Sequence, residues 1–264
     1  MLLSNEKIKD ILNKNAQGYP FILNMDASKE QLVEIANTIG NNNSKVVHFF
    51  TDKDTGSFTQ VRHDGLFSSI EMGWHYAGTA YHNPKEITEI LYCENPGTYG
   101  ITSFCNTKSF YDSIGEEMQD IIKDIKVKIS TDVMLGKKKP LFGNEVGIPI
   151  TKDSEEYKFF DKTMEVWKPL VVRHPWNHTY SLNNFVPGMI EDWTYDKGHH
   201  GKFLWESILD NMFSHQYVYN HNWKKGDLIF YDQYSSLHKR TETKGSRVMY
   251  RFALDNKNII DYVD

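Results

Sequence analysis

The residues best suited to chemistry are two histidines, one in the first third of the chain and one near its end. His75 lies in the segment Gly73-Trp74-His75-Tyr76-Ala77-Gly78, and His238 comes soon after Asp232. In an extended segment alternate side chains share a face, so His75 and Ala77 should point the same way. Many non-haem iron sites use two histidines and one carboxylate, which often follows the first histidine by two residues. Here that place holds the methyl group of Ala77.

Two arginines near the end of the chain form a candidate anion site. Arg247, Met249 and Arg251 alternate along a hydrophobic segment, so they should share one face of a strand. Burying two guanidinium groups is costly unless an anion meets them. A dicarboxylate suits this need, because carboxylate and guanidinium pair through two parallel hydrogen bonds. For Arg251, pairing with an internal Asp or Glu is an equally good interpretation.

These candidates need strands and helices to hold them, and the hydrophobic pattern predicts several. Ser28-Lys29-Glu30-Gln31 has the form of a capping box and opens a helix that ends near Gly40. Helical spacing predicts further helices at about 108–126 and 203–213. Strands are predicted at 46–50, 58–61, 87–93, 101–104, 170–174, 228–232 and 248–254. The predicted fold class is mainly β with flanking helices (α+β), with a double-sheet core of the jelly-roll type.

The length of 264 residues suits one domain, 1–264, and no period persists from about 128 to 168, which indicates a lid or insertion. The net charge of −5 gives no basic field, so we expect no nucleic-acid partner. Cys93 and Cys105 have apolar or aromatic neighbours and indicate core residues of a reducing compartment. The first residues turn polar too soon for a signal peptide, and no run approaches membrane-spanning length. We therefore expect a cytoplasmic protein without a membrane partner.

Four segments occur in an order and spacing that match a known family. The segment 64–75 leads into His75, and 99–104 contains Thr102 within a turn and strand. The segment 169–175 follows, and 223–251 contains Gly226-Asp227, His238 and both arginines. Together they resemble the iron(II)- and 2-oxoglutarate-dependent oxygenases of the taurine dioxygenase (TauD/TfdA-like) family. Tyr99 and Ile101 depart from the family's Gly-Gly-Asp-Thr pattern.

The resemblance implies a double-stranded β-helix (a jelly roll, cupin-like) and an oxidoreductase that uses Fe(II), 2-oxoglutarate and dioxygen. It implies that His75 and His238 are metal ligands and that Arg247 binds the distal carboxylate of 2-oxoglutarate. It also implies that Thr102 binds the carboxylate at the metal, and that Arg251 supports the cofactor or binds an acidic substrate group. Asp232 is expected to shape the turn before His238 rather than to bind iron.

Ala77 is the departure with the largest chemical consequence, because the family's hydroxylases carry Asp or Glu there. The related halogenases have Ala or Gly, and chloride takes the vacant metal position. The sequence thus favours an enzyme that chlorinates an unactivated carbon of a small molecule. A hydroxylase with a two-histidine site, a site that recruits Glu71 or His82, and a non-catalytic ligand-binding relative remain alternatives.

Substrate identity is left open by the sequence. The segment 128–168 and the loop with Trp176, Asn177 and His178 are the expected determinants, because lids select substrate in such scaffolds. A free amino acid, a nucleotide and a carrier-tethered acyl group are all compatible partners. The many aromatic residues also allow a homo-oligomer.

Overall fold

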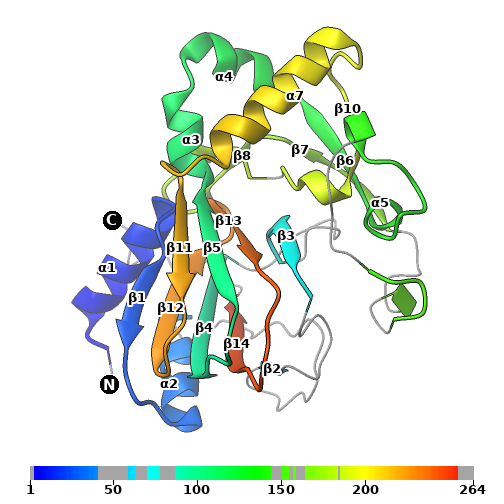
Figure 1. Ribbon diagram of the computed structural model, residues 1–264. Helices are drawn as coiled ribbons and strands as arrows, with labels where there is room; N and C mark the ends of the chain where they lie inside the picture. Colours follow the sequence, from blue (N-terminus) through cyan, green and yellow to red (C-terminus); the bar gives the residue numbers. More distant parts are fainter. Residues whose placement is uncertain are drawn as a thin grey trace.

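Two antiparallel sheets form the centre of the computed structural model, which describes residues 3–40, 59–62, 70–77, 87–143, 150–154, 157–158, 164–183 and 185–254 (Figure 1). The larger sheet has the strand order β1 (Phe21–Asn24), β12 (Asp227–Asp232), β4 (Thr88–Asn95), β14 (Val248–Leu254) and β2 (Thr59–Arg62). The second has the order β11 (Val218–Asn222), β5 (Ile101–Asn106), β13 (Ser236–Arg240) and β3 (Met72–His75).

The described part of the chain also contains two smaller antiparallel sheets and several helices. The three-stranded sheet contains β10 (Ile190–Trp193), β6 (Lys126–Ser130) and β7 (Glu165–Pro169), and the two-stranded sheet contains β8 (Val172–Arg173) and β9 (Tyr180–Ser181). The helices are α1 (Asn5–Ala16), α2 (Lys29–Ile39), α3 (Thr107–Ser113), α4 (Glu116–Ile122), α5 (Thr131–Met134) and α7 (His199–Met212), with 3-10 helices η1 (Leu141–Gly143) and η2 (Pro187–Met189).

The two central sheets pack face to face through aromatic and aliphatic side chains. Phe104 of β5 packs edge-on against Tyr231 of β12, with ring centroids 5.0 Å apart. Tyr231 also packs against His238, with ring centroids 5.1 Å apart. Cys93, Ile229 and Met249 are buried in the same cluster. His238 therefore points into the space between the sheets.

Two outer clusters support this centre. The apolar faces of α1 and α2 are buried in one cluster with Phe230, Phe252 and other side chains of the larger sheet. At the other end, α3, α4 and α7 lie close to β6, β7 and β10 (Figure 1), and their apolar residues form the second cluster around Trp193 and Trp205. No helix among the described residues is long and apolar enough to cross a membrane.

Most predicted elements that fall on described residues are present. The capping box at Ser28 forms, with the Ser28 hydroxyl accepting from the Gln31 N–H and the Gln31 side chain accepting from the Ser28 N–H. The strand predicted at 248–254 is β14, and 228–232 falls within β12. The strand predicted at 170–174 shortens to β8, and the one at 46–50 lies outside the described residues.

The single helix predicted at about 108–126 is wrong, because the chain forms two short helices there. Ile114 and Gly115 are extended, with ψ of 131° and 161°, and separate α3 from α4. Phe110, Ile122 and Ile125 are still buried in one cluster. The three- and four-residue spacing of the apolar residues therefore predicted correctly that these side chains are buried. Two short helices with a break between them show the same spacing as one continuous helix.

The segment 128–168 is also more regular than its lack of period indicated. It contains most of β6, all of α5 and η1, and most of β7, while 144–149, 155–156 and 159–163 lie outside the described residues. Lys128 of β6 and Lys138 both form ion pairs with Glu165 and Glu191. This polar network links neighbouring strands of the three-stranded sheet.

Candidate active site

The pairing of β3 with β13 brings together the two histidines identified from the sequence. His238 is the register partner of His75, and their ring centroids lie 4.2 Å apart with an interplanar angle of 49°. In an antiparallel pair, directly opposed side chains lie on the same face of the sheet. Strand pairing thus makes neighbours of two residues that are distant in the sequence.

Burial favours the neutral form of both imidazoles, and a hydrogen bond also fixes the tautomer of His75. His75 Nδ1 lies 2.7 Å from the Gly73 carbonyl oxygen, which can only accept, so Nδ1 carries the proton and Nε2 keeps its lone pair. Burial lowers the pKa of His75 and lowers that of His238 further, with the neighbouring Arg240 and Arg251 acting in the same direction. Neutral imidazole is the form that binds a metal ion.

Ala77 lies two residues after the end of β3, and its backbone is held by a side chain that is distant in the sequence. Its N–H donates to Gln233 Oε1 at 2.6 Å. Glu71, one candidate for replacing the carboxylate, is exposed at the other end of β3, and His82 lies outside the described residues. Within the described ranges no group of three or more His, Cys, Asp and Glu residues is arranged to hold a metal ion. In this part of the chain, the histidine pair therefore has no third protein ligand.

Arg247 precedes β14 and is buried, with 4 % of its surface exposed. Burial lowers its pKa to about 10, and its Nε has no hydrogen-bond partner in the described part of the chain. Its guanidinium carbon lies 5.9 Å from the centre of the Trp223 ring. Trp223 in turn donates from Nε1 to the hydroxyl oxygen of Thr102 at 2.8 Å. Trp223 thus connects the two residues expected to hold the two carboxylates of one ligand.

Arg251 is paired with an internal carboxylate. Its Nε and Nη2 donate to the two oxygens of Glu89 at 2.7 and 2.8 Å, and the Glu89 side chain is 2 % exposed. This geometry is a bidentate ion pair between β14 and β4. Of the two interpretations of Arg251, the structure supports the internal partner.

Arg240 is a cationic residue near the site that sequence reasoning missed. It lies two residues after His238 on the same strand, so both side chains should share the inner face of β13. Its Nη2 donates to the Ile70 carbonyl at 2.9 Å. Burial lowers its pKa to about 9, and nearby Arg247 contributes. The alternation from His238 to Arg240 was the available signal.

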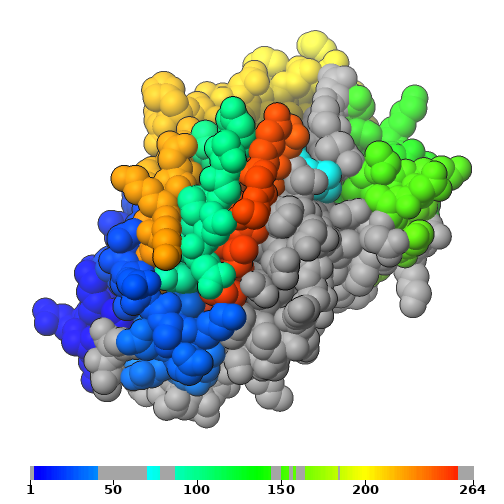
Figure 2. Space-filling model, turned by 60° about the horizontal axis from the view of Figure 1, so that its bottom comes forward, coloured from blue at the N-terminus to red at the C-terminus, as the bar shows by residue number. Residues whose placement is uncertain are grey.

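A cavity of about 380 Å³ opens where the loops β4–β5, β11–β12 and β13–β14 meet. Figure 2 shows these loops side by side, in green, orange and red-orange. Trp223, Thr241 and Lys244 line the cavity together with residues 96–101. Gly100 has φ +121°, and a Cβ there would lie 2.7 Å from Thr243 Cγ2, so the close approach of two loops requires glycine.

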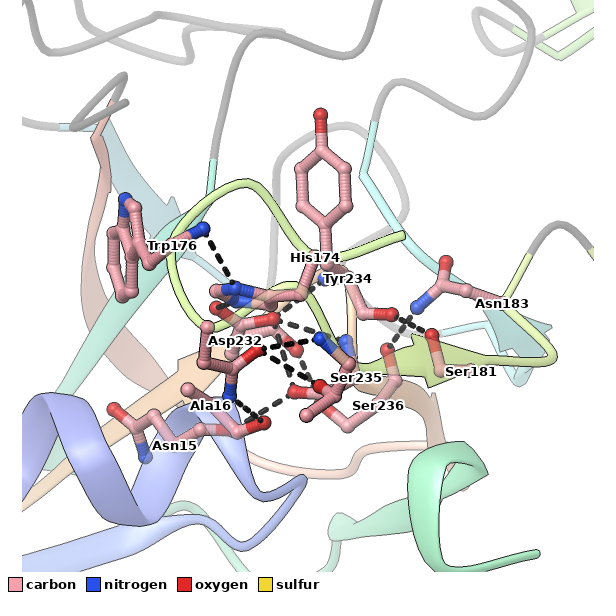
Figure 3. A network of polar contacts seen from close by, with 12 residues as sticks. Asn15, Ala16, His174, Trp176, Ser181, Asn183, Asp232, Tyr234, Ser235 and Ser236 are labelled. Atoms are coloured by element: carbon pink, nitrogen blue, oxygen red, sulfur yellow. Dashed lines mark hydrogen bonds and ion pairs between the residues drawn. The ribbon is translucent and has the colours of Figure 1, made fainter. Parts of the chain in front are cut away.

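A buried polar network fixes the turn that leads into β13 (Figure 3). Asp232 Oδ2 lies 2.9 Å from His174 Nε2, and Oδ1 accepts from the N–H groups of Tyr234 and Ser235 and from the Ser235 hydroxyl. The Ser236 hydroxyl donates to the Asp232 carbonyl. The expectation that Asp232 shapes the turn before His238 is confirmed.

The residues 174–178 stabilise the fold on the opposite side of this turn. Trp176 is 7 % exposed within the cluster around α1 and α2, and its N–H donates to His174 Nδ1 at 3.2 Å. Asn177 donates to the Ala16 carbonyl at 3.3 Å. Both side chains contribute to packing, and their expected role in substrate selection stays a prediction. Cys93 and Cys105, expected in the core, are buried and free.

The fold and the site define a class of protein. The site has two neutral histidines and a buried arginine whose Nε has no partner in the described chain, and it lies in a double-sheet core. This combination is typical of a non-haem, metal-dependent oxidoreductase. The chain belongs to the Taurine catabolism dioxygenase TauD, TfdA family, whose model matches residues 2–253. Enzymes of this family are dioxygenases that use Fe(II) and 2-oxoglutarate, also called α-ketoglutarate.

Solved structures with similar folds carry related descriptions. A putative α-ketoglutarate-dependent taurine dioxygenase from Burkholderia xenovorans has a TM-score of 0.69 at 16 % identity, covering 95 % of this chain and 83 % of that chain. AAD-2 in complex with Mn(II) and N-oxalylglycine has a TM-score of 0.66 at 20 % identity, covering 95 % and 88 %. A putative α-ketoglutarate-dependent 2,4-D dioxygenase from Burkholderia xenovorans has a TM-score of 0.64 at 19 % identity, covering 97 % and 90 %. None of the curated proteins matches this sequence.

Proposed function

We propose that this enzyme is a mononuclear non-haem Fe(II), 2-oxoglutarate-dependent oxidase that halogenates an unactivated carbon of a small molecule. The observation that carries the proposal is the register pair His75–His238, with ring centroids 4.2 Å apart beside Ala77. Two imidazoles suit iron in an oxygenase site, and the third protein ligand of such a site is normally a carboxylate. Ala77 has no lone pair, so one more metal position is open to an external anion.

The residues present fit this cofactor set. His75 and His238 would hold iron, and Arg247, whose buried Nε has no partner in the described chain, would bind the distal carboxylate of 2-oxoglutarate. The Thr102 hydroxyl accepts from Trp223 and keeps its own proton for the other carboxylate. When bound, iron would activate dioxygen with 2-oxoglutarate as the electron donor, and together they would supply the oxidant that removes hydrogen from an aliphatic carbon. Burial between the two sheets would keep bulk water from this centre.

The same observations support a finer description of the fold. We infer that the two central sheets form a double-stranded β-helix and that residues 1–264 are a single 2-oxoglutarate oxygenase domain. The antiparallel five- and four-stranded sheets and the TM-scores of 0.64–0.69 support this inference. We further propose that a lid or insertion around 128–168 selects a small substrate, with the two strands β6 and β7 as its fixed base.

Anaerobic titration with Fe(II) and 2-oxoglutarate tests the cofactor assignment. We expect a visible charge-transfer band of the chelate in the wild type, since both histidines and Arg247 are available. Absence of the band would show that the chain is a non-catalytic relative. Adding chloride at constant ionic strength should shift the band, because a halide enters the position beside Ala77.

The substitution Ala77→Asp tests the open position itself. A carboxylate there should restore a three-ligand site and abolish the chloride-dependent shift, while the band remains. If the chloride response survives in Ala77→Asp, the halide lies elsewhere. A band that ignores chloride in the wild type would instead favour a two-histidine hydroxylase.

A further inference from the structure

Gln233 is a buried amide in contact with the residue that stands where a carboxylate ligand is expected. It is 3 % exposed, and its Oε1 accepts from the Ala77 N–H at 2.6 Å. Its Nε2 is buried and has no hydrogen-bond partner among the described residues. Burying a polar group without a hydrogen-bond partner is destabilising, so native proteins normally provide a partner.

The chemistry of the missing partner follows from the contact that is made. A backbone N–H can only donate, so the arm of the Gln233 amide that meets Ala77 must be the carbonyl. The other arm is therefore the NH₂ group, which only donates. Its missing partner must be an acceptor, such as an anion.

The backbone of Gln233 is held rigidly before any ligand binds. Its N–H donates to the Ile87 carbonyl at 2.8 Å, and Asp232 before it is fixed by His174 and Ser235 (Figure 3). The same turn leads into β13 and fixes the register of His238 opposite His75. One turn therefore sets the position of the amide and of one histidine together.

The charges around the histidine pair favour an anion. Two cationic residues, Arg240 and Arg251, lie near the histidine pair, and the carboxylate of Glu89 lies near His75. Glu89 is engaged in the bidentate pair with Arg251. Arg240, two residues after His238 on β13, is thus a further cationic group near the histidine pair.

We propose that Gln233 is a positioning residue whose Nε2 hydrogen-bonds a halide in the metal position beside Ala77, so that its amide and the vacancy form one anion site. This inference rests on the proposed function and identifies the protein group that would hold the halide. The halide would be the missing hydrogen-bond acceptor for the buried Gln233 Nε2, while Oε1 accepts from the Ala77 N–H.

The experiment uses the anaerobic wild-type protein loaded with Fe(II) and 2-oxoglutarate, titrated with sodium chloride at constant ionic strength. The readout is the chloride concentration at the midpoint of the band shift. Gln233→Leu removes the donor at similar volume and should raise this midpoint at least tenfold, because a hydrogen bond to a charged group contributes about 1.5–3 kcal/mol. Gln233→Glu keeps an acceptor for the Ala77 N–H and should abolish the shift by repelling the anion.

Gln119→Leu is the matched control, since the Gln119 side chain also bonds the backbone, by donating to the Tyr111 carbonyl, but lies on α4. It should leave the chloride midpoint unchanged. An unchanged midpoint in Gln233→Leu, with a normal band, overturns this inference and leaves the proposed function standing. A wild-type band that ignores chloride overturns the halide site, and a wild type without any band overturns the cofactor assignment as well. If Gln233→Leu does not fold, Gln233→Glu decides, and a retained shift in that variant also overturns the inference.

Discussion

At the scale of single residues, the site is built from side chains whose hydrogen-bonding capacity is only partly used. His238 Nδ1, Gln233 Nε2 and Arg247 Nε are buried and unpaired in the described chain. In the proposed assignments, these groups would bind the metal, the halide and 2-oxoglutarate, respectively. Such groups are destabilising in the protein alone and become satisfied by a ligand.

The assignment of His238 as a metal ligand predicts that His238→Gln weakens metal binding at least 100-fold. Residues that only support a ligand change metal affinity by roughly 10–100-fold, and loss of a ligand itself should have a larger effect. Binding of Mn(II) is measured by calorimetry or by electron paramagnetic resonance. His221→Gln is the control, because His221 is also buried but is paired with Asp227 at 2.9 Å. Equal loss of affinity in both variants would contradict the assignment of His238.

At the scale of elements, the pairing of β4 with β14 is reinforced by a buried charge pair. Arg251 and Glu89 form two hydrogen bonds across these strands. Because the pair is largely removed from water, removing one partner leaves an uncompensated charge in the core. Arg251 is thus held by its own sheet, whereas the buried Nε of Arg247, just before the same strand, has no hydrogen-bond partner in the described part of the chain.

We expect Glu89→Gln to lower the free energy of unfolding by about 3–5 kcal/mol, since the Arg251 side chain, which is 12 % exposed, would lose its bidentate carboxylate partner. Urea unfolding followed by circular dichroism measures this change. Glu206→Gln removes an exposed pair with Lys202 at 3.6 Å and should change stability very little. Similar stability of both variants would mean that the buried pair contributes no more than a surface one.

At the scale of the whole molecule, the site joins distant parts of the chain. β3 and β13 supply the histidines, β5 supplies Thr102, and the turn before β14 supplies Arg247. Binding one composite ligand should therefore stabilise the two central sheets as a unit. Ligands that bind only the native state raise the unfolding temperature by mass action.

Mn(II) together with N-oxalylglycine, which replaces a methylene of 2-oxoglutarate by NH, provides a redox-inert test. At about 100 times Kd the gain is roughly 2.7 kcal/mol, which corresponds to a rise in Tm of roughly 5–10 °C for a chain of this size. Arg247→Leu should abolish the part of the shift that depends on N-oxalylglycine and retain the part due to Mn(II). An undiminished shift in that variant would exclude Arg247 as the carboxylate partner.

The sequence by itself determined the chemical types and most of the regular elements. Strand β14, the helix α2 with its capping box and the candidate residues His75, His238 and Arg247 follow from local pattern, motif order and resemblance. Local spacing failed at Ile114 and Gly115, because a helix break preserves the burial pattern that a continuous helix would show. Residue type and regular secondary structure depend mainly on neighbouring residues in the chain, and the sequence gives these directly.

Only the tertiary structure decided which polar groups meet. It paired Arg251 with Glu89, brought Arg240 towards Arg247, and set Gln233 against Ala77. The Arg251–Glu89 and Gln233–Ala77 contacts join segments far apart in the sequence, and Arg240 and Arg247 meet across one turn, so all three depend on register and turn geometry. Both are fixed by the packing of whole sheets, and a single segment carries no record of them.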